Sequence, residues 1–452
     1  MKKSSLCLVI VLLSVFMIAV FLLAGCKAKA AAPLTSNEEF DAWAANIRKN
    51  LGGTEIKVAA ATHPSINAFK KMVPQFEKMT GIKVMLEEME EDLLGQKILL
   101  DATSGKSSYD VVMSCPEFTP KLVDLGIPSP LDNWLADKQK SPSWFDSEDI
   151  LQAYKDMLSF DGNIYGIPFA GETIFIMYRK DIFEKYGLEV PTTFDELLKT
   201  AKFIQENVPD MAGNSMRTRV GWEATYQWSE FIFPFGGKII DFDTNKPAFD
   251  QQGTIDSLKY FVELAKTGPA GIESYSFPEA WDTFMQSKAG ISVECSAAAP
   301  EVENPDKSVV VGKVGYAKMP AGPAGAFSGV WGWGFSMIDA SKKKDAAWAF
   351  ITYMTGKHMQ AEYIANGGIV SRVSWLENPE KQKEFPYYRA LLDTLKQAAA
   401  LTAKGYGVVI PDERWQKLSS IMGTEVSRAV TGEITAEEAC ANMQKQAVDI
   451  WK

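Results

Sequence analysis

Residues 54–60 read Thr-Glu-Ile-Lys-Val-Ala-Ala, a short apolar run with the period-2 alternation of a strand. A segment with apolar side chains at helical spacing follows at 64–79, and the pattern continues with a strand at 82–86, a helix at 90–100 and a strand at 109–114. Strands that alternate with helices of this length indicate βαβ units and a parallel sheet. Because such crossovers are right-handed, we expect helices on both faces of the sheet.

The same alternation extends through the rest of the chain. We expect further strands at 174–178 and 289–295, and further helices at 193–206, 254–266, 345–354 and 425–430. The chain has 452 residues, of which 46% are hydrophobic and 23% are charged, as in ordinary globular proteins. This length predicts two domains, with three as the alternative, each able to bury its own core.

The N-terminus has a different pattern. Two lysines precede an apolar run over 6–23, interrupted only by Ser14, and the run ends in Leu-Ala-Gly-Cys at 23–26. A basic start, an apolar segment and a small-residue cleavage site predict a secretory signal over 1–25. The alternative is an uncleaved transmembrane helix, although the run is close to the short limit for spanning a bilayer. In both cases we expect the rest of the chain to work outside the cytoplasm.

The cysteine that ends this run is the more specific feature. Leu-Ala-Gly-Cys resembles the lipobox of bacterial lipoproteins, and the resemblance implies cleavage before Cys26 and acylation of its sulfur. Residues 26–36 are rich in alanine and lack apolar periodicity, so we expect a flexible lipidated tether there. An N-terminal helix is expected at 37–53, with Phe40 and Trp43 on its apolar face.

Charge, cysteine and histidine content exclude several kinds of site. The chain has a net charge of −10, and the predicted signal holds two lysines and no acidic residue, so an acidic protein remains that is a poor partner for nucleic acid. Cys115, Cys295 and Cys440 are odd in number and far apart, which predicts three buried thiols, with one pair as the alternative. Because His63 and His358 are the only histidines, no histidine-rich metal site and no cofactor is expected.

Aromatic residues are numerous, with 12 Trp, 14 Tyr and 25 Phe. Core packing accounts for most of them. A surplus of tryptophan in a secreted protein also suits sugar recognition, because the apolar face of a sugar or polyol stacks on an indole while its hydroxyls bond to nearby polar groups.

Three blocks of sequence carry a family resemblance. The first comprises Gly-Asn-Ile-Tyr-Gly-Ile-Pro-Phe at 162–169, Ile-Met-Tyr-Arg-Lys-Asp-Ile-Phe-Glu-Lys-Tyr-Gly at 176–187 and Pro-Thr-Thr-Phe-Asp-Glu-Leu at 191–197; the second comprises 315–320, 329–338 and 341–351, and the third 430–439. In this order the blocks resemble the extracellular solute-binding proteins of bacterial ABC importers, in the carbohydrate-binding group. Residues 168–173 and 423–426 are most similar to the sorbitol and mannitol binders, with another mono- or oligosaccharide ligand as the alternative.

The resemblance implies an α/β fold of two lobes, each a mostly parallel sheet flanked by helices, with crossing strands at a hinge. Lobe one would comprise 54–168 and 329–380, and lobe two 172–325 and 385–452. Ligands of such folds lie in the crevice at the strand ends, and hinge closure traps them.

The implied function involves no chemistry, so we do not expect an enzyme. A sugar or polyol would be captured between the lobes and delivered to the transmembrane permease subunits of an ABC importer. We expect a monomer without cofactor or nucleic acid, held through lipidated Cys26 at the outside of the cell membrane, with a periplasmic membrane face as the alternative.

Five residues near the expected crossings are the strongest candidates for ligand contact. Glu172 lies where the chain would cross between lobes, and its carboxylate can accept hydrogen bonds from two hydroxyls, with a surface acid or an interlobe ion pair as the alternative. Trp331 and Trp333 alternate with glycines, so in a strand both indoles face one side, as stacking platforms or as core. Trp222 and Tyr226 are four residues apart and share one helix face, with a core stripe as the alternative.

Three further candidates come from loops. His63 follows the first strand at a corner that faces the crevice, and a neutral imidazole both donates and accepts; the alternative is a helix cap. Glu117, followed by Phe118, occupies the equivalent corner after the third strand. Arg372 lies near a return crossing, and its donors suit a polyhydroxyl ligand, although a structural ion pair is the stronger expectation. Trp415 is expected in the core.

Two other functions fit parts of the sequence. A secreted carbohydrate-active hydrolase could use paired carboxylates such as Glu172 and Glu117. Against it, the sequence has no GxSxG elbow and no phosphate loop of the GxxxxGK[ST] type. An adhesive surface lipoprotein is the third interpretation, and it would need no closing crevice.

Overall fold

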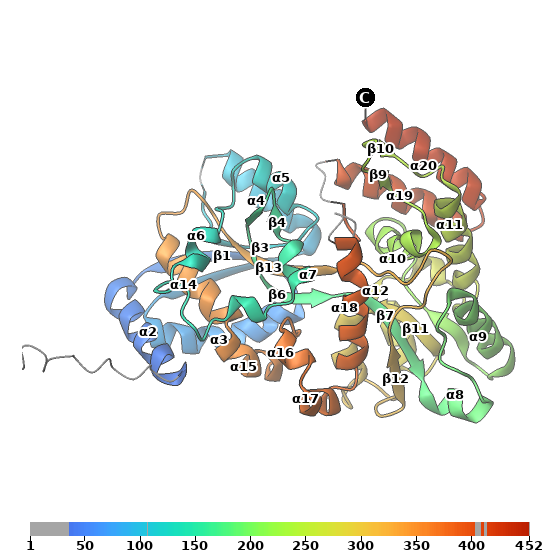
Figure 1. Ribbon diagram of the computed structural model, residues 1–452, viewed down its shortest axis with the longest axis horizontal. Helices are drawn as coiled ribbons and strands as arrows, with labels where there is room; N and C mark the ends of the chain where they lie inside the picture. The colour runs from blue at the N-terminus through green and yellow to red at the C-terminus, as the bar shows by residue number, and fades with distance from the viewer. Residues whose placement is uncertain (1–35, 106, 403–407, 411–413, 452) are drawn as a thin grey trace, which may run out of the picture.

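The structure, a computed structural model, describes residues 36–105, 107–402, 408–410 and 414–451. The predicted signal, Cys26 and the tether as far as residue 35 lie outside these residues. Two lobes lie side by side, each built around one sheet with helices packed on it (Figure 1). The predicted α/β fold of two lobes is confirmed.

The sheet of the first lobe has five strands in the order β2-β1-β3-β13-β6. Their bounds are β1 (Glu55–Ala61), β2 (Lys83–Met89), β3 (Val111–Ser114), β6 (Ile167–Glu172) and β13 (Trp331–Met337). The alternation predicted for 54–114 is confirmed, because β1 pairs in parallel with both β2 and β3 through the crossover helices α3 (Pro64–Thr80) and α4 (Glu91–Thr103). Gly81 ends α3 with a φ of 73°, a left-handed conformation that suits glycine.

The sheet of the second lobe has four strands in the order β12-β7-β11-β8. Their bounds are β7 (Ile174–Arg179), β8 (Ala212–Ser215), β11 (Ala289–Cys295) and β12 (Val314–Ala317). The strands predicted at 174–178 and 289–295 are β7 and β11. The later helices predicted from the sequence are present as α9 (Phe194–Asn207), α11 (Gln252–Ala265), α14 (Lys344–Thr355) and α19 (Trp415–Val430).

The prediction of mostly parallel sheets is confirmed, although each sheet is mixed because one of its strands runs against the others. In the first sheet β13 is antiparallel to both β3 and β6, and in the second β7 is antiparallel to both β11 and β12. The reversed strand of each sheet is the one that arrives directly from the other lobe. It enters at the edge where the other strands end, and its central position converts two pairings to antiparallel.

Shorter elements complete the lobes. The helices are α5 (Thr119–Asp124), α6 (Asp132–Ala136), α7 (Gln152–Asp156), α8 (Lys180–Tyr186), α10 (Trp222–Ile232), α12 (Phe277–Met285), α13 (Ala299–Val302), α15 (Gln360–Ala365), α16 (Val373–Leu376), α17 (Pro379–Glu384), α18 (Tyr388–Thr402) and α20 (Ala436–Ile450). Two hairpins are formed by β4 (Ser159–Phe160) with β5 (Asn163–Ile164) and by β9 (Ile240–Asp241) with β10 (Lys246–Pro247). Helix α18 packs on α7 in the first lobe and on β7 and β12 in the second, and therefore bridges the two lobes.

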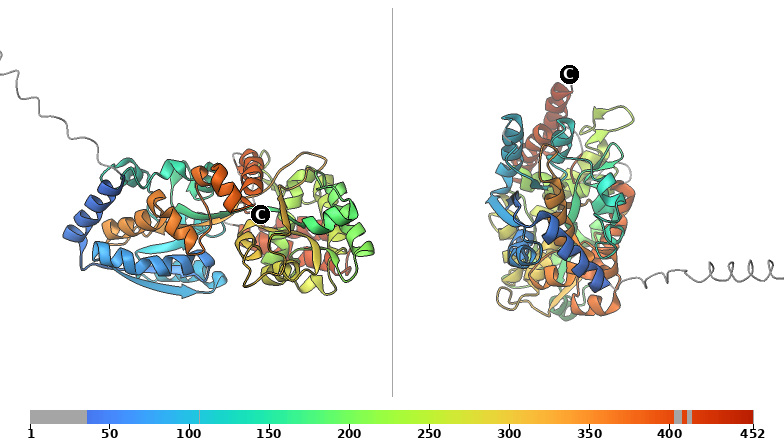
Figure 2. Two further views of the ribbon diagram at one scale, coloured as in Figure 1. Left: turned by 90° about the horizontal axis from the view of Figure 1, so that it is seen from below. Right: turned by 90° about the vertical axis from the view of Figure 1, so that its left-hand side faces the viewer.

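The N-terminal helix α2 (Ser36–Leu51) confirms the helix predicted after the tether. Phe40 and Trp43 both pack edge-on against Trp144, with ring centroids 5.0 and 4.9 Å away. Burial of these rings attaches α2 to the first lobe, at the end of the molecule that is distant from the second lobe (Figure 2). Among the described helices, none has both the length and the apolar character that a membrane span requires.

The glycines of β13 allow close packing behind the strand. A Cβ at Gly332 would clash with the Ala170 carbonyl oxygen of β6 and would lie 2.8 Å from the Met157 Cε. We therefore expect Gly332→Ala to cost about 1–3 kcal/mol of unfolding free energy, because the obstacle on β6 is backbone and cannot move aside cheaply. Urea unfolding measures this cost. An equal stability of variant and wild type would contradict the close β6–β13 approach.

Candidate functional site

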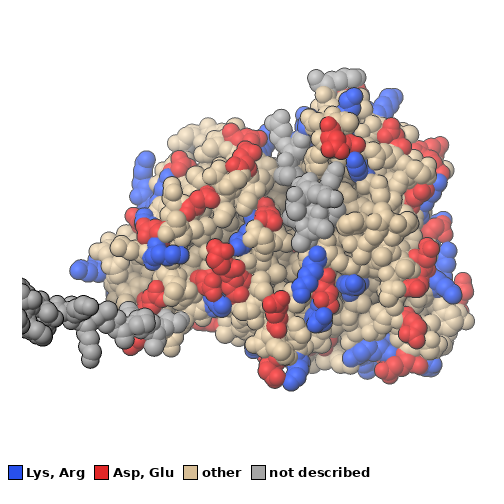
Figure 3. Space-filling view, viewed as in Figure 1, with Lys and Arg blue, Asp and Glu red and all other residues tan. Residues whose placement is uncertain are grey.

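A cleft of about 740 Å³ lies between the two lobes. The first lobe lines it with the loop after β1, the start of α3 and the indoles of β13, and the second lobe lines it with α10, α12 and the segment after β11. The cleft therefore collects side chains from segments that are far apart in the sequence. Figure 3 shows one face of the molecule, on which acidic and basic side chains are interspersed over both lobes.

Glu172 is the last residue of β6 and lies in the cleft where the chain leaves the first lobe. Its Oε2 accepts a hydrogen bond from the Cys295 Sγ at 3.2 Å. Burial raises the pKa of Glu172, while the Cys295 hydrogen bond and the positive charge of Arg217 act in the opposite direction. The carboxylate thus has remaining acceptor capacity in a desolvated position, where a bound hydroxyl would be a strong partner.

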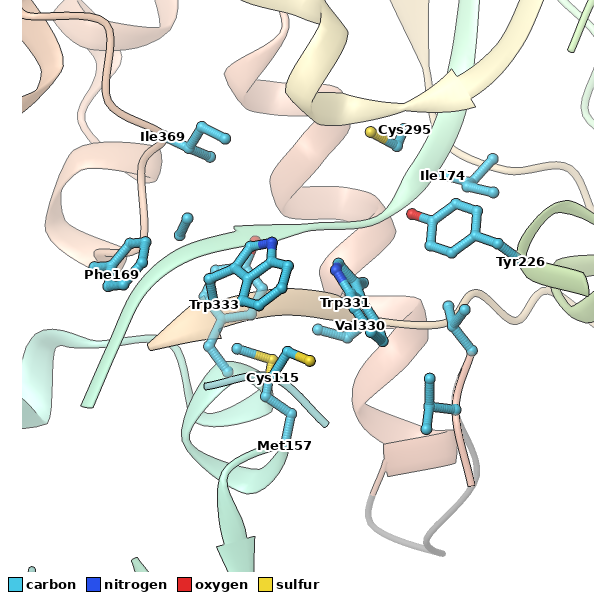
Figure 4. Close-up of a cluster of buried hydrophobic side chains, with 14 of the residues drawn as sticks. Cys115, Met157, Phe169, Ile174, Tyr226, Cys295, Val330, Trp331, Trp333 and Ile369 are labelled. Carbon is cyan, nitrogen blue, oxygen red and sulfur yellow. The ribbon is translucent and has the colours of Figure 1, made fainter. Parts of the chain in front are cut away.

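Four aromatic side chains surround this carboxylate. Trp331 pairs with Glu172 across β13 and β6, and its ring lies 6.0 Å from Trp333 and 5.1 Å from Trp222, between centroids. Tyr226 lies 5.6 Å from Trp222 on the same face of α10. Figure 4 shows both indoles on β13, with the Tyr226 ring opposite them. These predicted candidates are therefore brought together, and together they offer flat apolar faces to the cleft.

The Tyr226 hydroxyl points inward, toward Cys295 and the indoles (Figure 4). It is buried and has no hydrogen-bond partner among the described residues. An unpaired buried hydroxyl destabilises the ligand-free protein. A ligand group that forms a hydrogen bond to it would remove this cost and so bind more tightly.

Arg217 holds the second-lobe wall in place. Its Nε and Nη2 donate to the Glu294 carboxylate at 2.9 and 2.6 Å, and its Nη1 donates to Glu223 at 3.3 Å. The guanidinium carbon lies 4.4 Å from the ring centroids of both Tyr226 and Phe277. This double stacking fixes Tyr226 from behind.

His63 lies at the cleft as predicted from its position after β1, and it also caps a helix. Its Nδ1 accepts a hydrogen bond from the Ser65 backbone N–H at 3.1 Å, at the start of α3. Burial lowers the pKa of His63 to about 4, so the imidazole is neutral at neutral pH. With Nδ1 as an acceptor, Nε2 carries the proton and is a donor.

Two predicted candidates lie elsewhere. Arg372 is fully buried within the first lobe, where its Nη1 and Nη2 donate to the carbonyl oxygens of Asp146, Phe145 and Thr355. Its Nη1 also lies 3.8 Å from the Asp149 carboxylate, which agrees with the expected structural ion pair and not with a ligand contact. Glu117 lines a separate hollow of about 50 Å³, which corrects its placement in the crevice.

Trp415 and Trp228 are among the tryptophans buried in the core. Trp415 is buried on α19, as expected, and the Trp228 indole donates to the Ser257 hydroxyl at 3.1 Å. All three cysteines within the described chain, Cys115, Cys295 and Cys440, are buried free thiols. Within the same residues, no group of three or more potential metal ligands is found.

Several cleft residues were missed by sequence reasoning. They are Asn67, Lys71, Arg217, Glu223, Phe277, Trp281, Glu301 and Lys307. Phe277 and Trp281 carried a usable signal, because they are four residues apart behind a Ser276 capping box, which places both on one helix face. Arg217 carried none, since its partner Glu294 is 77 residues away.

Comparisons with known proteins agree with this architecture. The sequence profile described as bacterial extracellular solute-binding protein matches residues 60–361. A probable amino-acid ABC transporter periplasmic-binding protein of Sinorhizobium fredii is 26% identical over 410 residues, which cover 89% of this chain and 90% of the relative.

Two solved structures are also similar. A solute-binding protein of Agrobacterium radiobacter in complex with ribitol has a TM-score of 0.79 at 25% identity and covers 88% of this chain and 99% of its own. A solute-binding protein of Agrobacterium vitis with bound D-mannitol has a TM-score of 0.77 at 28% identity, with coverages of 88% and 98%. The profile spans more than half of the sequence, and this chain belongs to the family of bacterial extracellular solute-binding proteins.

Proposed function

We propose that this protein captures a sugar alcohol or a sugar in the cleft between its lobes and delivers it unaltered to the permease of an ABC importer. The observation that carries the proposal is the combination of a buried carboxylate, Glu172, an unpartnered hydroxyl, Tyr226, and the surrounding indoles. Hydroxyls of the ligand would bond to Glu172 and Tyr226, and the apolar face of the ligand would stack on the indoles. The solved relatives that hold ribitol and D-mannitol support this class of ligand.

Two of the three Lys and Arg side chains that line the cleft are paired with acids, which favours a neutral ligand over an acidic one. The Arg217 guanidinium is matched by Glu294 and Glu223, and Lys307 pairs with Glu301 at 2.7 Å. Glu172 forms no salt bridge within the described residues, so it would repel a carboxylate or phosphate on the ligand.

We also propose the extents of the two lobes, the oligomeric state and the membrane attachment of the protein. Lobe one would comprise 54–168 with 329–380, and lobe two 172–325 with 385–452. The protein would be a monomer held outside the cell membrane through acylated Cys26, and it would have no enzymatic activity. The hydrolase alternative is not favoured, because Glu117 does not share the cleft with Glu172.

A thermal-shift panel tests the ligand class. Ribitol, D-mannitol, sorbitol, erythritol, common mono- and disaccharides, sugar acids and amino acids are each added at several concentrations. We expect one or a few neutral polyols or sugars to raise the melting temperature, because a ligand that binds only the native state stabilises it by about 2.7 kcal/mol at 100 times its Kd. A response confined to amino acids or sugar acids, or turnover of a responding compound, would contradict the proposal.

A further inference from the structure

The two strand crossings between the lobes are joined to each other by hydrogen bonds at one buried point. Thr173, the single residue between β6 and β7, places its Oγ1 2.7 Å from the Ser328 Oγ and donates to the Gly329 carbonyl oxygen at 2.8 Å. Ser328 and Gly329 belong to the return crossing that enters β13. All of this lies away from solvent, since Thr173 and Ser328 are at most 1% exposed.

Glu230 of α10 holds this point from the second lobe. Its Oε2 accepts hydrogen bonds from the Gly329 N–H at 2.8 Å and from the Ser328 hydroxyl at 3.0 Å. Its Oε1 lies close against the crossing, because a Cβ at Gly329 would be 2.6 Å from it. The buried Glu230 carboxylate accepts hydrogen bonds from two neighbouring residues, Ser328 and Gly329, and so attaches the return crossing firmly to α10. We call Glu230, Thr173, Ser328 and Gly329 the crossing cluster.

The same helix face reaches the cleft. Trp222, Tyr226 and Glu230 follow each other at intervals of four residues on α10, so they form one stripe along the helix. The first two line the cleft and the third binds the crossings. Four residues of helix span about 6 Å, so a ligand contact at Tyr226 is one rigid helical turn away from the crossing cluster.

The hydrogen bonds also divide the crossings between the lobes. Glu172 still pairs with Trp331 in the sheet of the first lobe, whereas Thr173 is already bonded to Ser296 of the second lobe through backbone groups. On the return crossing, Gly329 is held by Glu230 and pairing within β13 begins at Trp331. Within these two crossings, the Glu172–Thr173 link and residues 329–331 are the parts left to bend.

We propose that Glu230 is a positioning residue that fixes both strand crossings to the second lobe, and thereby confines their bending to the Glu172–Thr173 link and residues 329–331. The purpose of the motion, closure around a solute, rests on the proposed function. The location of the hinge and the role of Glu230 do not, and both can be measured without any ligand.

The experiment compares Glu230→Gln and Glu230→Ala with the wild type in ligand-free protein. Glutamine keeps the shape and one acceptor but loses the charge, and alanine removes both. Ser229→Ala is the matched control, because it deletes a buried hydroxyl on the same helix whose bond goes only to the Tyr226 carbonyl oxygen. Hydrogen exchange is followed in peptides that contain Gly329. Spin labels at exposed Lys78 and Lys199, each replaced by cysteine, report the distance between the lobes.

We expect exchange at Gly329 to rise at least about tenfold in the alanine variant, by less in the glutamine variant and not in the control. The distribution of interlobe distances should broaden in the same order. Unchanged exchange and distances in both Glu230 variants, or equal changes in Ser229→Ala, would overturn the proposal. If the alanine variant does not fold, the glutamine variant decides the result. A failed ligand panel with a positive exchange result would reject the proposed ligand class while leaving the role of Glu230 standing.

Discussion

Replacing Glu172 with alanine is expected to weaken binding of the captured polyol or sugar by at least about 100-fold and to leave the fold intact. The carboxylate lines the cleft, and two ligand hydroxyls donating to it would each form a charge-assisted bond worth about 1.5–3 kcal/mol. The fold should tolerate the change because, among the described residues, this side chain has one hydrogen bond, from the Cys295 thiol. Isothermal titration with the compound that responds in the ligand panel measures the effect.

Two controls give this result its meaning. Glu189→Ala removes an exposed acid of the second lobe outside the cleft and should change affinity by less than about twofold. Glu172→Gln keeps the shape and removes the charge, so it should show an intermediate loss. Wild-type affinity in Glu172→Ala would exclude Glu172 from the site.

The pH dependence of binding follows from the same carboxylate. Burial raises the pKa of Glu172 above its ordinary value of 4.5. Because the ionised form is the stronger acceptor, affinity should fall as the pH is lowered through the raised pKa. The Glu172→Gln variant should lack this dependence, and a wild-type profile that is flat or rises toward acid would contradict it.

Replacing Arg217 with methionine is expected to cost about 3–5 kcal/mol of unfolding free energy. Its partner Glu294 is fully buried, and removal of the guanidinium would leave that carboxylate uncompensated. The stacked rings of Tyr226 and Phe277 would also lose the group between them. Urea unfolding at neutral pH measures the loss.

Arg219→Met is the matched control for this variant. Arg219 lies two residues away and pairs with the same Glu223, yet its side chain is 52% exposed, so its removal should cost about 0–1 kcal/mol. Equal losses in the two variants would show that burial of the Glu294 charge is not the cause. A double variant, Arg217→Met with Glu294→Gln, should recover part of the stability because it removes the orphaned charge.

Local patterns were sufficient for the elements that a single segment defines. The βαβ alternation of 54–114 follows from apolar periodicity within each segment, and α2 and β7 were predicted in the same way. Trp331 and Trp333 were placed on one side of a strand because alternation fixes which side chains share a face. Glu172 was placed at the crossing through the family resemblance.

Properties set by distant segments could not be predicted. The mixed sheets arise because β13 and β7 come from the opposite lobe, and nothing within either strand encodes its direction. The ligand contact considered for Arg372 could not be tested from the sequence, because its acceptors, the carbonyl oxygens of Phe145 and Thr355, come from other segments of the first lobe. Arg217 and Glu230 bond to partners 77 and 99 residues away, beyond the range of any local pattern.

The position of α2 has a consequence for a tethered molecule. Phe40 and Trp43 fasten the N-terminal helix to lobe one, so any leash that precedes residue 36 pulls on that lobe alone. If acylated Cys26 holds the protein at a membrane as proposed, lobe one would be the attached lobe and lobe two the one that moves. The permease would then contact lobe one in both states of the protein, and it would contact lobe two in the closed position only after a solute is bound.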